Sequence, residues 1–407
     1  MINTLMVSLA ILLSANPDTG QAQQVTRRDS ARIWFSVGKD YFNKNNLERA
    51  IANFKRALSY DSTMVEIYLH LGQAYLKLGQ FDSAEIAYRK VAEIDPKDSR
   101  GWQGLGFMYG IVKKDVEKGI EFYKKALEVD PGNNDARFGL ATLLDKAGRT
   151  QEADSIYQAA IAADPENPAI LKAYGVFLAQ KKEYARALPY LEKAHEKKPQ
   201  DEKVAGLLLD AYLNLAQQEK DKQTKRFYYE KALTLLDAKL AQDSTDVGLL
   251  IKRANVLASL GRVDEAIRDL DRAIELRPDI PNALLIKANL LMEVKKDYAG
   301  ARKLLKKALE MDLPDNVRAA TLALLADAYF YPAEALRKEA DALRKKGLEL
   351  EARKKYGEAV PFYDKAIQTY KKVLQYPGTR WTEYARKQVK RAQSLRKKAW
   401  RRSQGIE

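Results

Sequence analysis

The chain has 407 residues, of which 46% are hydrophobic and 31% are charged, with a formal net charge of +15 and no cysteine. This share of apolar residues is enough to build a packed core, which excludes a largely disordered chain. The lack of cysteine excludes a disulfide framework, a thiolate metal site and a cysteine nucleophile.

The N-terminal end has the pattern of a secretory signal peptide. A short apolar run is followed by a helix-breaking Asn-Pro pair and then by a small-x-small pattern that ends at Ala22. The run is too short to cross a bilayer, and no later stretch approaches the length of a membrane span. We expect residues 1–22 to be cleaved off, 23–30 to form a short linker, and the first ordered helix to begin near Asp29 or Ser30. The expected location is periplasmic or secreted, and it is cytoplasmic if the signal does not function.

The rest of the chain repeats itself with a period of 34 residues, which superimposes Gly38, Gly72 and Gly106. Each period contains two stretches with apolar residues three and four positions apart, which predicts two amphipathic helices. A second position, where the two helices would cross, never holds a residue larger than alanine. Its residues are Ala50, Ala84, Gly119, Ala153, Ala187, Ala232, Ala266, Ala301 and Ala359. The sequence therefore predicts a stack of helix pairs.

One period matches the pattern of a known family in order, through Trp102, Leu105, Gly106, Tyr109, Gly119, Tyr123, Ala126 and Pro131. The chain thus resembles the tetratricopeptide repeat (TPR) family over about residues 31–376. The resemblance implies an all-α, right-handed superhelical solenoid of about nine antiparallel helix pairs with a C-terminal capping helix. It says little about the partner, because one fold hosts many functions.

The expected units are of unequal length. Residues 31–201 form five regular units, 202–246 one unit with an insertion, 247–315 two units, 316–378 an extended and irregular helix pair, and 379–407 a basic capping helix and tail. The insertion is close to three helical turns, so its two helices can lengthen and keep their apolar faces in phase.

The last helix pair allows two registers, because either Ala359 or Ala366 can be the crossing residue. Its additional material, residues 334–356, is expected to be helical, with leucines seven residues apart at Leu336 and Leu343 and again at Leu350. The final helix carries one apolar stripe. The stripe consists of Trp381, Ala385, Gln388, Ala392, Leu395 and Ala399.

The sequence contains no clear pattern of a catalytic or metal-binding site. The two histidines, His70 and His195, are about four repeats apart, so neither a histidine dyad nor a histidine-rich metal site is expected. The glycines from Gly101 to Gly106 belong to a helix-packing motif and follow no strand, so they are no phosphate loop. We expect no catalytic, cofactor or metal site, and a non-enzymatic protein.

The resemblance places a partner-binding groove on the inner face, lined by side chains of the first helix of each pair. Transferred by register, these are Arg32, Phe35, Lys39, Phe42, Leu69, Gln73, Arg100, Gln103, Phe107, Phe138, Lys172 and Val176. Aromatic side chains there would anchor apolar groups of an extended peptide, while amides and cations would bind its backbone and carboxylates. The alternative is that Phe35, Phe107 and Phe138 only pack between neighbouring first helices.

Positive charge is concentrated at the C-terminal end: from Ala333 to Glu407 there are 21 Lys or Arg and 9 Asp or Glu, a net of +12. Opposite the stripe of the final helix lie Arg386, Lys387, Lys390, Arg391, Lys397, Lys398, Arg401 and Arg402. Such a helix can bind an anionic membrane, an envelope polymer or nucleic acid, and nucleic acid ranks last if the chain is exported. The other interpretation is a cap with a solvated basic outer face.

The sequence therefore predicts a protein–protein interaction scaffold of the bacterial cell envelope that binds a partner protein or peptide in its groove. The alternative function is binding of an anionic surface through the basic C-terminal helix. Neither pattern names the partner or specifies an oligomeric state.

Overall fold

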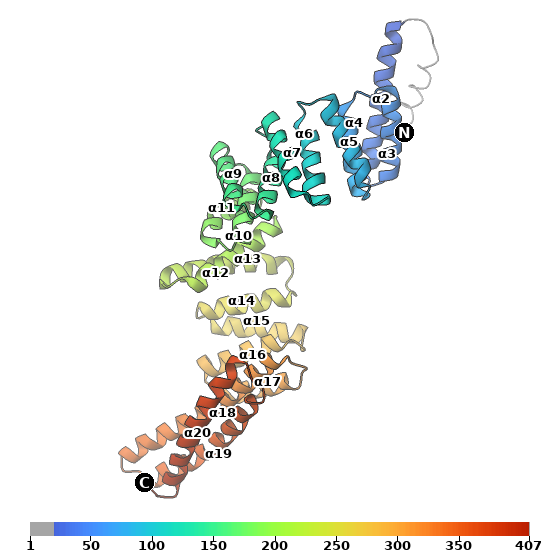
Figure 1. The fold of residues 1–407 in the computed structure, drawn as a ribbon. Helices are drawn as coiled ribbons and strands as arrows, with labels where there is room; N and C mark the ends of the chain where they lie inside the picture. The colour runs from blue at the N-terminus through green and yellow to red at the C-terminus, as the bar shows by residue number, and fades with distance from the viewer. Residues whose placement is uncertain (1–19, 407) are drawn as a thin grey trace. The chain divides into compact units, whose positions relative to one another are not determined.

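The described part of the chain, residues 20–406 of a computed structural model, is helical and contains no strand (Figure 1). It falls into two compact units, Met1–Leu207 (unit 1) and Leu208–Glu407 (unit 2), with the boundary inside helix α12 (Glu202–Gln218). The all-α fold is confirmed. Most of the expected signal peptide, residues 1–22, lies outside the described residues.

Unit 1 is built from helices that pair in chain order. They are α2 (Gly20–Asn43), α3 (Leu47–Tyr60), α4 (Val65–Lys77), α5 (Phe81–Ile94), α6 (Ser99–Phe107) with the π-helical turn η1 (Met108–Val112), α7 (Val116–Val129), α8 (Asn134–Lys146), α9 (Thr150–Ala163), α10 (Pro168–Gln180) and α11 (Tyr184–Lys197). Each first helix packs on its own second helix and on the first helix of the next pair, as in α4, α6 and α8. This is the packing of a helix-pair solenoid, so the predicted solenoid is confirmed.

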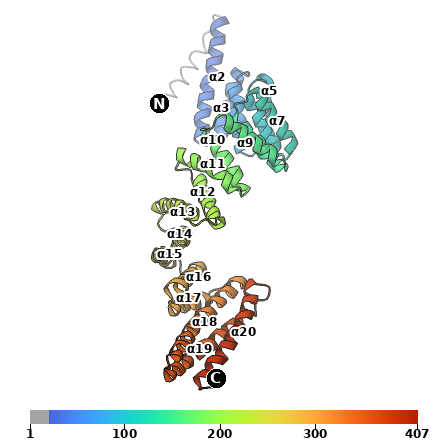
Figure 2. The same cartoon turned by 90° about the vertical axis from the view of Figure 1, so that its left-hand side faces the viewer.

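Unit 2 contains the remaining helices. They are α13 (Lys222–Gln242), α14 (Val247–Ser259), α15 (Val263–Leu276), α16 (Pro281–Leu290) with the π-helical turn η2 (Leu291–Lys295), α17 (Tyr298–Leu309), α18 (Asp315–Lys345), α19 (Glu349–Val373) and α20 (Arg380–Ser403). The long ones are α13, α18, α19 and α20. The helices α18, α19 and α20 lie side by side and contact one another (Figure 2). Across residues 20–406, no helix is both long enough and apolar enough to cross a bilayer.

The small residue of each repeat lies where two helices touch. The alanines at this position are fully buried, namely Ala50, Ala84, Ala153, Ala187, Ala232, Ala266, Ala301 and Ala359. At Gly119 even a methyl group would not fit, because an added Cβ would lie 2.5 Å from the Cα of Gly110. Gly110 belongs to η1, so this turn and Gly119 approach each other backbone to backbone. The size rule seen in the sequence therefore has a steric cause.

The N-terminal helix begins earlier than expected. Helix α2 starts at Gly20, so residues 23–30 are helical, the expected linker is absent there, and the predicted start near Asp29 or Ser30 is wrong. After Gly20 the segment contains neither proline nor glycine before Gly38, and it is rich in glutamine, alanine and arginine, which favour helix. Asp29 sits inside α2 and pairs with Arg32 at 3.6 Å instead of capping the helix.

The insertion around the unit boundary lengthens helices, as the sequence suggested. Helices α12 and α13 have 17 and 21 residues, whereas α14 and α15, which follow them, have 13 and 14. The added residues therefore extend both helices and do not form a separate loop domain.

The C-terminal end of unit 2 is a three-helix bundle of α18, α19 and α20. In α19 alanine and tyrosine alternate at heptad spacing and are at most 1% exposed, at Ala352, Tyr356, Ala359, Tyr363, Ala366 and Tyr370. Both candidates for a single crossing residue, Ala359 and Ala366, are thus buried. A heptad seam of this kind keeps one face toward its partners over several turns, so no single crossing point is needed.

Two expectations for this region need correction. Residues 334–356 do not form one helix, because α18 ends at Lys345 and Gly347 adopts a left-handed φ of 78° before α19 begins. Leu350, expected to continue the row of leucines spaced by seven residues, is 84% exposed. The stripe of α20 does face inward, with Ala392 fully buried, but it packs on both α18 and α19. Helix α20 is therefore a full member of the bundle as well as the end of the stack.

Candidate functional site

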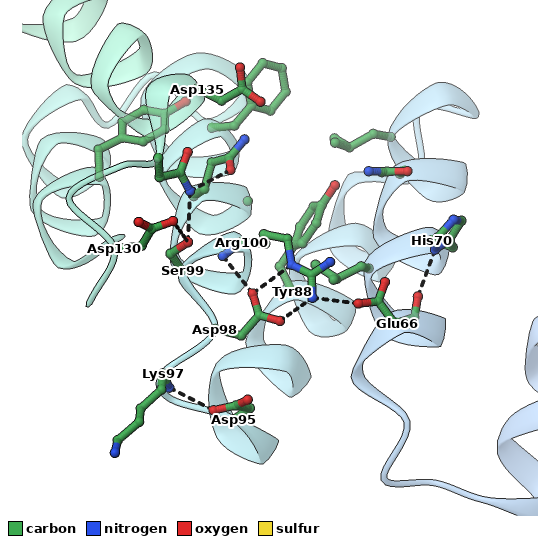
Figure 3. Close-up of a pocket in the computed structure, with 18 residues that line it drawn as sticks. Glu66, His70, Tyr88, Asp95, Lys97, Asp98, Ser99, Arg100, Asp130 and Asp135 are labelled. Atoms are coloured by element: carbon green, nitrogen blue, oxygen red, sulfur yellow. Dashed lines mark hydrogen bonds and ion pairs between the residues drawn. The ribbon is translucent and has the colours of Figure 1, made fainter. Parts of the chain in front are cut away.

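A pocket of about 1050 Å³ lies along the first helices of three successive pairs in unit 1 (Figure 3). Helix α4 contributes one face with the spacing of three and four residues, at Glu66, Leu69, His70 and Gln73. Helix α6 contributes the equivalent face 34 residues later, at Arg100, Gln103, Gly104 and Phe107. The repeat thus places the same register of two helices toward one cavity, which α8 closes with Asp135.

The floor of the pocket depends on glycine. A Cβ added to Gly104 would lie 2.3 Å from Cδ1 of Tyr88, so only glycine lets the tyrosine ring reach the backbone of α6. Gly139 and Tyr123 repeat this contact in the next pair, also at 2.3 Å. Burial raises the pKa of Tyr88 and of Tyr123 to about 12. Both tyrosines therefore stay uncharged at neutral pH and form an apolar base.

The guanidinium of Arg100 is already occupied. It donates to Glu66 Oε1 at 2.7 Å and to the two carboxylate oxygens of Asp98 at 2.9 and 2.6 Å (Figure 3). These hydrogen bonds raise the pKa of Arg100, and the bond from Arg100 is the main cause of the lowered pKa of Asp98. Asp98 also caps α6, because it accepts from the backbone N–H of Arg100 at 3.0 Å. The predicted role of Arg100 in binding a partner carboxylate is therefore not supported by this geometry.

A second polar group holds α8 against α6. The amide nitrogen of Asn133 donates to Ser99 Oγ at 3.0 Å and to Gln103 Oε1 at 3.1 Å, and its oxygen caps α8 by accepting from Ala136 at 2.9 Å. The Ser99 hydroxyl in turn donates to Asp130 at 3.5 Å. This leaves the NH₂ group of Gln103 and the whole amide of Gln73 as polar groups that can meet a ligand.

The pocket is acidic although the chain is basic. Its carboxylates are Glu66, Asp95, Asp98, Asp130 and Asp135, and its cations are Lys97 and Arg100. Asp95 and Asp130 accept from nearby backbone N–H groups, and within residues 20–406 neither of them nor Asp135 forms an ion pair. With Arg100 shared between two carboxylates, the electrostatic field of the pocket is negative.

Five of the predicted groove residues meet in this pocket: Leu69, Gln73, Arg100, Gln103 and Phe107. Phe107 is 39% exposed to solvent. The other seven lie outside the pocket, and several have partners of their own. Among the aromatic residues, Phe35 and Phe42 pack edge-on against His70, and Phe138 stacks on Tyr157. Among the cations, Lys39 lies over the Phe35 ring, Arg32 pairs with Asp29, and Lys172 pairs with Asp201. Val176 is half-buried.

Sequence reasoning missed the acidic half of the pocket and the role of His70. The Nδ1 atom of His70 lies 2.9 Å from the carbonyl oxygen of Glu66, so Nδ1 carries the proton and donates. The ring also contacts Phe35 at 5.1 Å and Phe54 at 5.7 Å, which makes it part of the wall. The sequence did contain a signal for these two pocket residues. A shift by one repeat of 34 residues aligns Glu66 with the predicted groove residue Arg100, and it aligns His70 with Gly104.

Unit 2 has a smaller pocket of about 730 Å³ between α14 and α16, with contributions from α13 and α18. Its lining is mostly amide and aliphatic, including Asn255, Asn289 and Leu285, with one cation, Lys252, and one carboxylate, Glu293. Over the described residues, no group of three or more His, Cys, Asp or Glu side chains could hold a metal ion.

The predicted basic surface on α20 divides into two groups. Arg391 donates to Glu334 at 2.9 Å and Arg402 donates to Asp341 at 2.5 Å, so both bind α20 to α18. The others are exposed, namely Arg386, Lys387, Lys390, Lys397, Lys398 and Arg401.

Comparison with known proteins assigns the fold to a family. Residues 3–244 match the family of the cilia and flagella-associated protein 70 C-terminal domain, a TPR domain, and residues 251–315 match the tetratricopeptide repeat itself. The chain belongs to the tetratricopeptide repeat family. TPR proteins are generally non-enzymatic scaffolds for protein–protein interaction.

Individual similarities of this TPR chain are low. It is 24% identical over 360 residues to human protein O-mannosyl-transferase TMTC3, covering 77% of this chain and 38% of that protein. It is 23% identical over 269 residues to human DnaJ homolog subfamily C member 7, covering 62% of this chain and 54% of that protein. The chain thus spans about two fifths to one half of these relatives.

Solved structures with similar helix stacking include a TPR protein from Cytophaga hutchinsonii, at 19% identity and a TM-score of 0.49, which covers 61% of this chain and 98% of the other. Another is a TPR protein from Parabacteroides merdae, at 17% identity and a TM-score of 0.37, which covers 64% and 98%.

Proposed function

We propose that unit 1 is a non-enzymatic scaffold that binds an extended, positively charged segment of a partner protein in the pocket formed by α4, α6 and α8. The observation that carries the proposal is the pairing of Arg100 with Glu66 and Asp98, which leaves Asp95, Asp130 and Asp135 without an ion pair within residues 20–406. Membership in the TPR family supports a scaffold of this class.

The pocket offers the groups that peptide recognition needs. At about 1050 Å³ it is large enough for several side chains. Phe107 presents an exposed ring, and the amide of Gln73 and the NH₂ group of Gln103 can bond to the backbone of an extended chain. Aromatic residues dominate interface energetics when they fill a desolvated contact, so Phe107 is the expected anchor.

Charge decides which segments enter. A partner carboxylate would meet Asp95, Asp130 and Asp135, and like charges at an interface disfavour binding. A lysine or arginine would instead find Asp95 and Asp130, whose donors among residues 20–406 are neutral groups. Electrostatic attraction of this kind acts mainly on the association rate and weakens as salt is added.

The test uses fluorescence anisotropy with two labelled peptides of equal length that share their apolar residues. One peptide carries Lys and Arg, and the other carries Asp and Glu. We expect the full chain to bind the basic peptide and not the acidic one. Phe107→Ala should weaken binding about tenfold, which corresponds to about 1.4 kcal/mol. Asp135→Lys should also weaken it and reduce its salt dependence.

Matched control variants are available. Phe227→Ala removes a phenylalanine that is 48% exposed on α13 of unit 2, and Glu128→Lys reverses an exposed carboxylate on α7 outside the pocket. Both should bind the basic peptide as the unaltered chain does. Preference for the acidic peptide, or equal binding by the pocket and control variants, would remove this pocket from the proposal.

We also propose that the protein acts in the bacterial cell envelope, which rests on the signal-like pattern ending at Ala22. Cleavage after Ala22 would take only the first three residues from helix α2, which begins at Gly20 and runs to Asn43. Expressed in a bacterium with its own N-terminus, the protein should be recovered from the periplasmic fraction beginning at Gln23. Recovery from the cytoplasm with Met1 intact would contradict this location.

A further inference from the structure

Nine of the ten Lys and Arg side chains of α20 are sorted by the fold into two groups, and the tenth, Arg380, lies over the Trp381 ring. Arg391, Arg396 and Arg402 reach back to acids on α18 and α19, at Glu334, Asp364 and Asp341. Six others are exposed and have no hydrogen bond or ion pair within residues 20–406, namely Arg386, Lys387, Lys390, Lys397, Lys398 and Arg401. The helix contains a single acid, Glu383. The positive charge that remains free is therefore all on the outer side.

Helix geometry shows how closely these free cations are grouped. At 100° per residue, Arg386, Lys390, Lys397 and Arg401 fall within roughly 60° of one another around the helix axis. The buried line of Ala385, Ala392 and Ala399 lies on the opposite side. Along the axis the row extends over roughly 22 Å at the usual rise per residue. The result is a straight row of cations on a convex helix face.

An exposed aromatic ring flanks this row. Trp400 is 45% exposed and lies one residue before Arg401 and three after Lys397. The other tryptophan of α20, Trp381, is half-buried against the bundle. Tryptophan is enriched at the headgroup level of bilayers, where its ring enters the interface and its N–H stays hydrated.

We propose that the outer face of α20 docks on an anionic phospholipid surface, with the cation row over the lipid headgroups and Trp400 inserted among them. A planar surface can meet all four cations of a straight row at once. No residue of α20 lines either of the two pockets described above. This surface is separate from the peptide pocket of unit 1 and does not depend on it.

The test is flotation of the full chain with two kinds of vesicle, phosphatidylcholine alone and phosphatidylcholine mixed with phosphatidylglycerol. We expect binding to the mixed vesicles only, and release as salt is raised. Each cation near an anionic membrane contributes about fivefold in affinity, so Lys390→Gln, Lys397→Gln and Arg401→Gln together should weaken binding by about 100-fold. Trp400→Ala should remove the blue shift of tryptophan fluorescence that accompanies binding.

A matched control separates the face of α20 from net charge. Lys303→Gln, Lys306→Gln and Lys307→Gln remove three exposed cations from α17 of the same unit, none of which has an ion pair among the described residues. This variant should bind as the unaltered chain does. Since none of the altered side chains supports the fold, all variants should keep the same thermal unfolding midpoint.

Three results would overturn the proposal. Equal binding to both vesicle types would show that anionic lipid is not recognised. Equal weakening by the α17 control would show that only net charge matters. If a short DNA duplex displaces the chain from the vesicles at a concentration below that of the lipid, the same face binds a polynucleotide in preference to lipid.

Discussion

Replacing Tyr384 with phenylalanine should loosen the three-helix bundle of unit 2, because the Tyr384 hydroxyl donates a hydrogen bond of 2.8 Å to the carboxylate of Asp327. Asp327 lies on α18 and is only 8% exposed. Its second donor is the hydroxyl of Tyr370 on α19, and no cation of the described chain pairs with it. One carboxyl group therefore joins all three helices.

The expected loss depends on the charge of Asp327. A hydrogen bond to an ionised group contributes about 1.5–3 kcal/mol, and one between neutral groups about 0.5–1.5 kcal/mol. Burial raises the pKa of Asp327, and the hydrogen bonds from Tyr370 and Tyr384 partly oppose that rise. Above the raised pKa, Tyr384→Phe should cost about 1.5–3 kcal/mol, and below it about 0.5–1.5 kcal/mol.

The sign for the unaltered chain follows from the same shift. Because the folded pKa of Asp327 is raised above its unfolded value of about 3.9, the folded state holds this proton more tightly. The contribution of Asp327 to stability is therefore fully present below the unfolded pKa and is lost as pH rises through the folded pKa. Tyr331, which also faces this region, has a pKa raised mainly by burial and stays neutral across that range.

Hydrogen exchange of the α20 amides measures this local stability at a series of pH values that starts at about pH 4, near the unfolded pKa of aspartate, and rises through the folded pKa of Asp327. Tyr229→Phe is a suitable control, because Tyr229 is half-buried in the same unit and its hydroxyl has no partner among residues 20–406. It should leave α20 exchange unchanged. A loss for Tyr384→Phe that is the same at every pH of the series, or no loss at any of them, would refute the role assigned to the carboxylate.

Three further substitutions test the packing of unit 1. Gly119→Ala would place a Cβ 2.5 Å from the Cα of Gly110, so we expect a loss of about 1–3 kcal/mol in urea denaturation, and an unchanged midpoint would contradict the close approach. Lys182→Gly relieves a left-handed φ of 61° and should stabilise the unit by about 0.5–1 kcal/mol, measured in the same way. Gly104→Ala would put a Cβ 2.3 Å from Tyr88, so it should both destabilise unit 1 and weaken the basic peptide in anisotropy; unaltered peptide affinity would show that this floor is not needed.

The features that the sequence predicted are those fixed by steric rules within one repeat. A position that holds only alanine or glycine in every period predicts a helix crossing, and Ala50 and Ala84 are fully buried at such crossings. The glycine at Gly72 is equally local, since an added Cβ would lie 2.7 Å from the Tyr88 ring of the same pair. Contacts of this kind recur in other repeats, as between Gly38 and Phe54 and between Gly106 and Tyr123, so period and residue size are sufficient to find them.

The C-terminal bundle was harder to predict because it leaves the repeat. The heptad of Tyr356, Tyr363 and Tyr370 was readable in the sequence, but it competes with the 34-residue pattern that the preceding units establish. Leucines spaced by seven suggested a continuous helix through Leu350, whereas Gly347 turns the chain back there. Which of two overlapping periods governs a segment depends on tertiary packing, and that information is not local.

Charge was the least predictable property, because a side chain's formal charge says nothing about whether it is already paired. Arg100 seemed suited to a partner carboxylate, yet Glu66 and Asp98 occupy it, and the pocket around it becomes acidic within a chain of net charge +15. On α20 the same sorting works in the opposite direction: Arg391 and Arg402 pair with acids of the bundle, whereas the six exposed cations of the outer face have no ion pair within the described residues. The two surfaces are therefore expected to select partners of opposite charge, and only the intramolecular pairing reveals which is which.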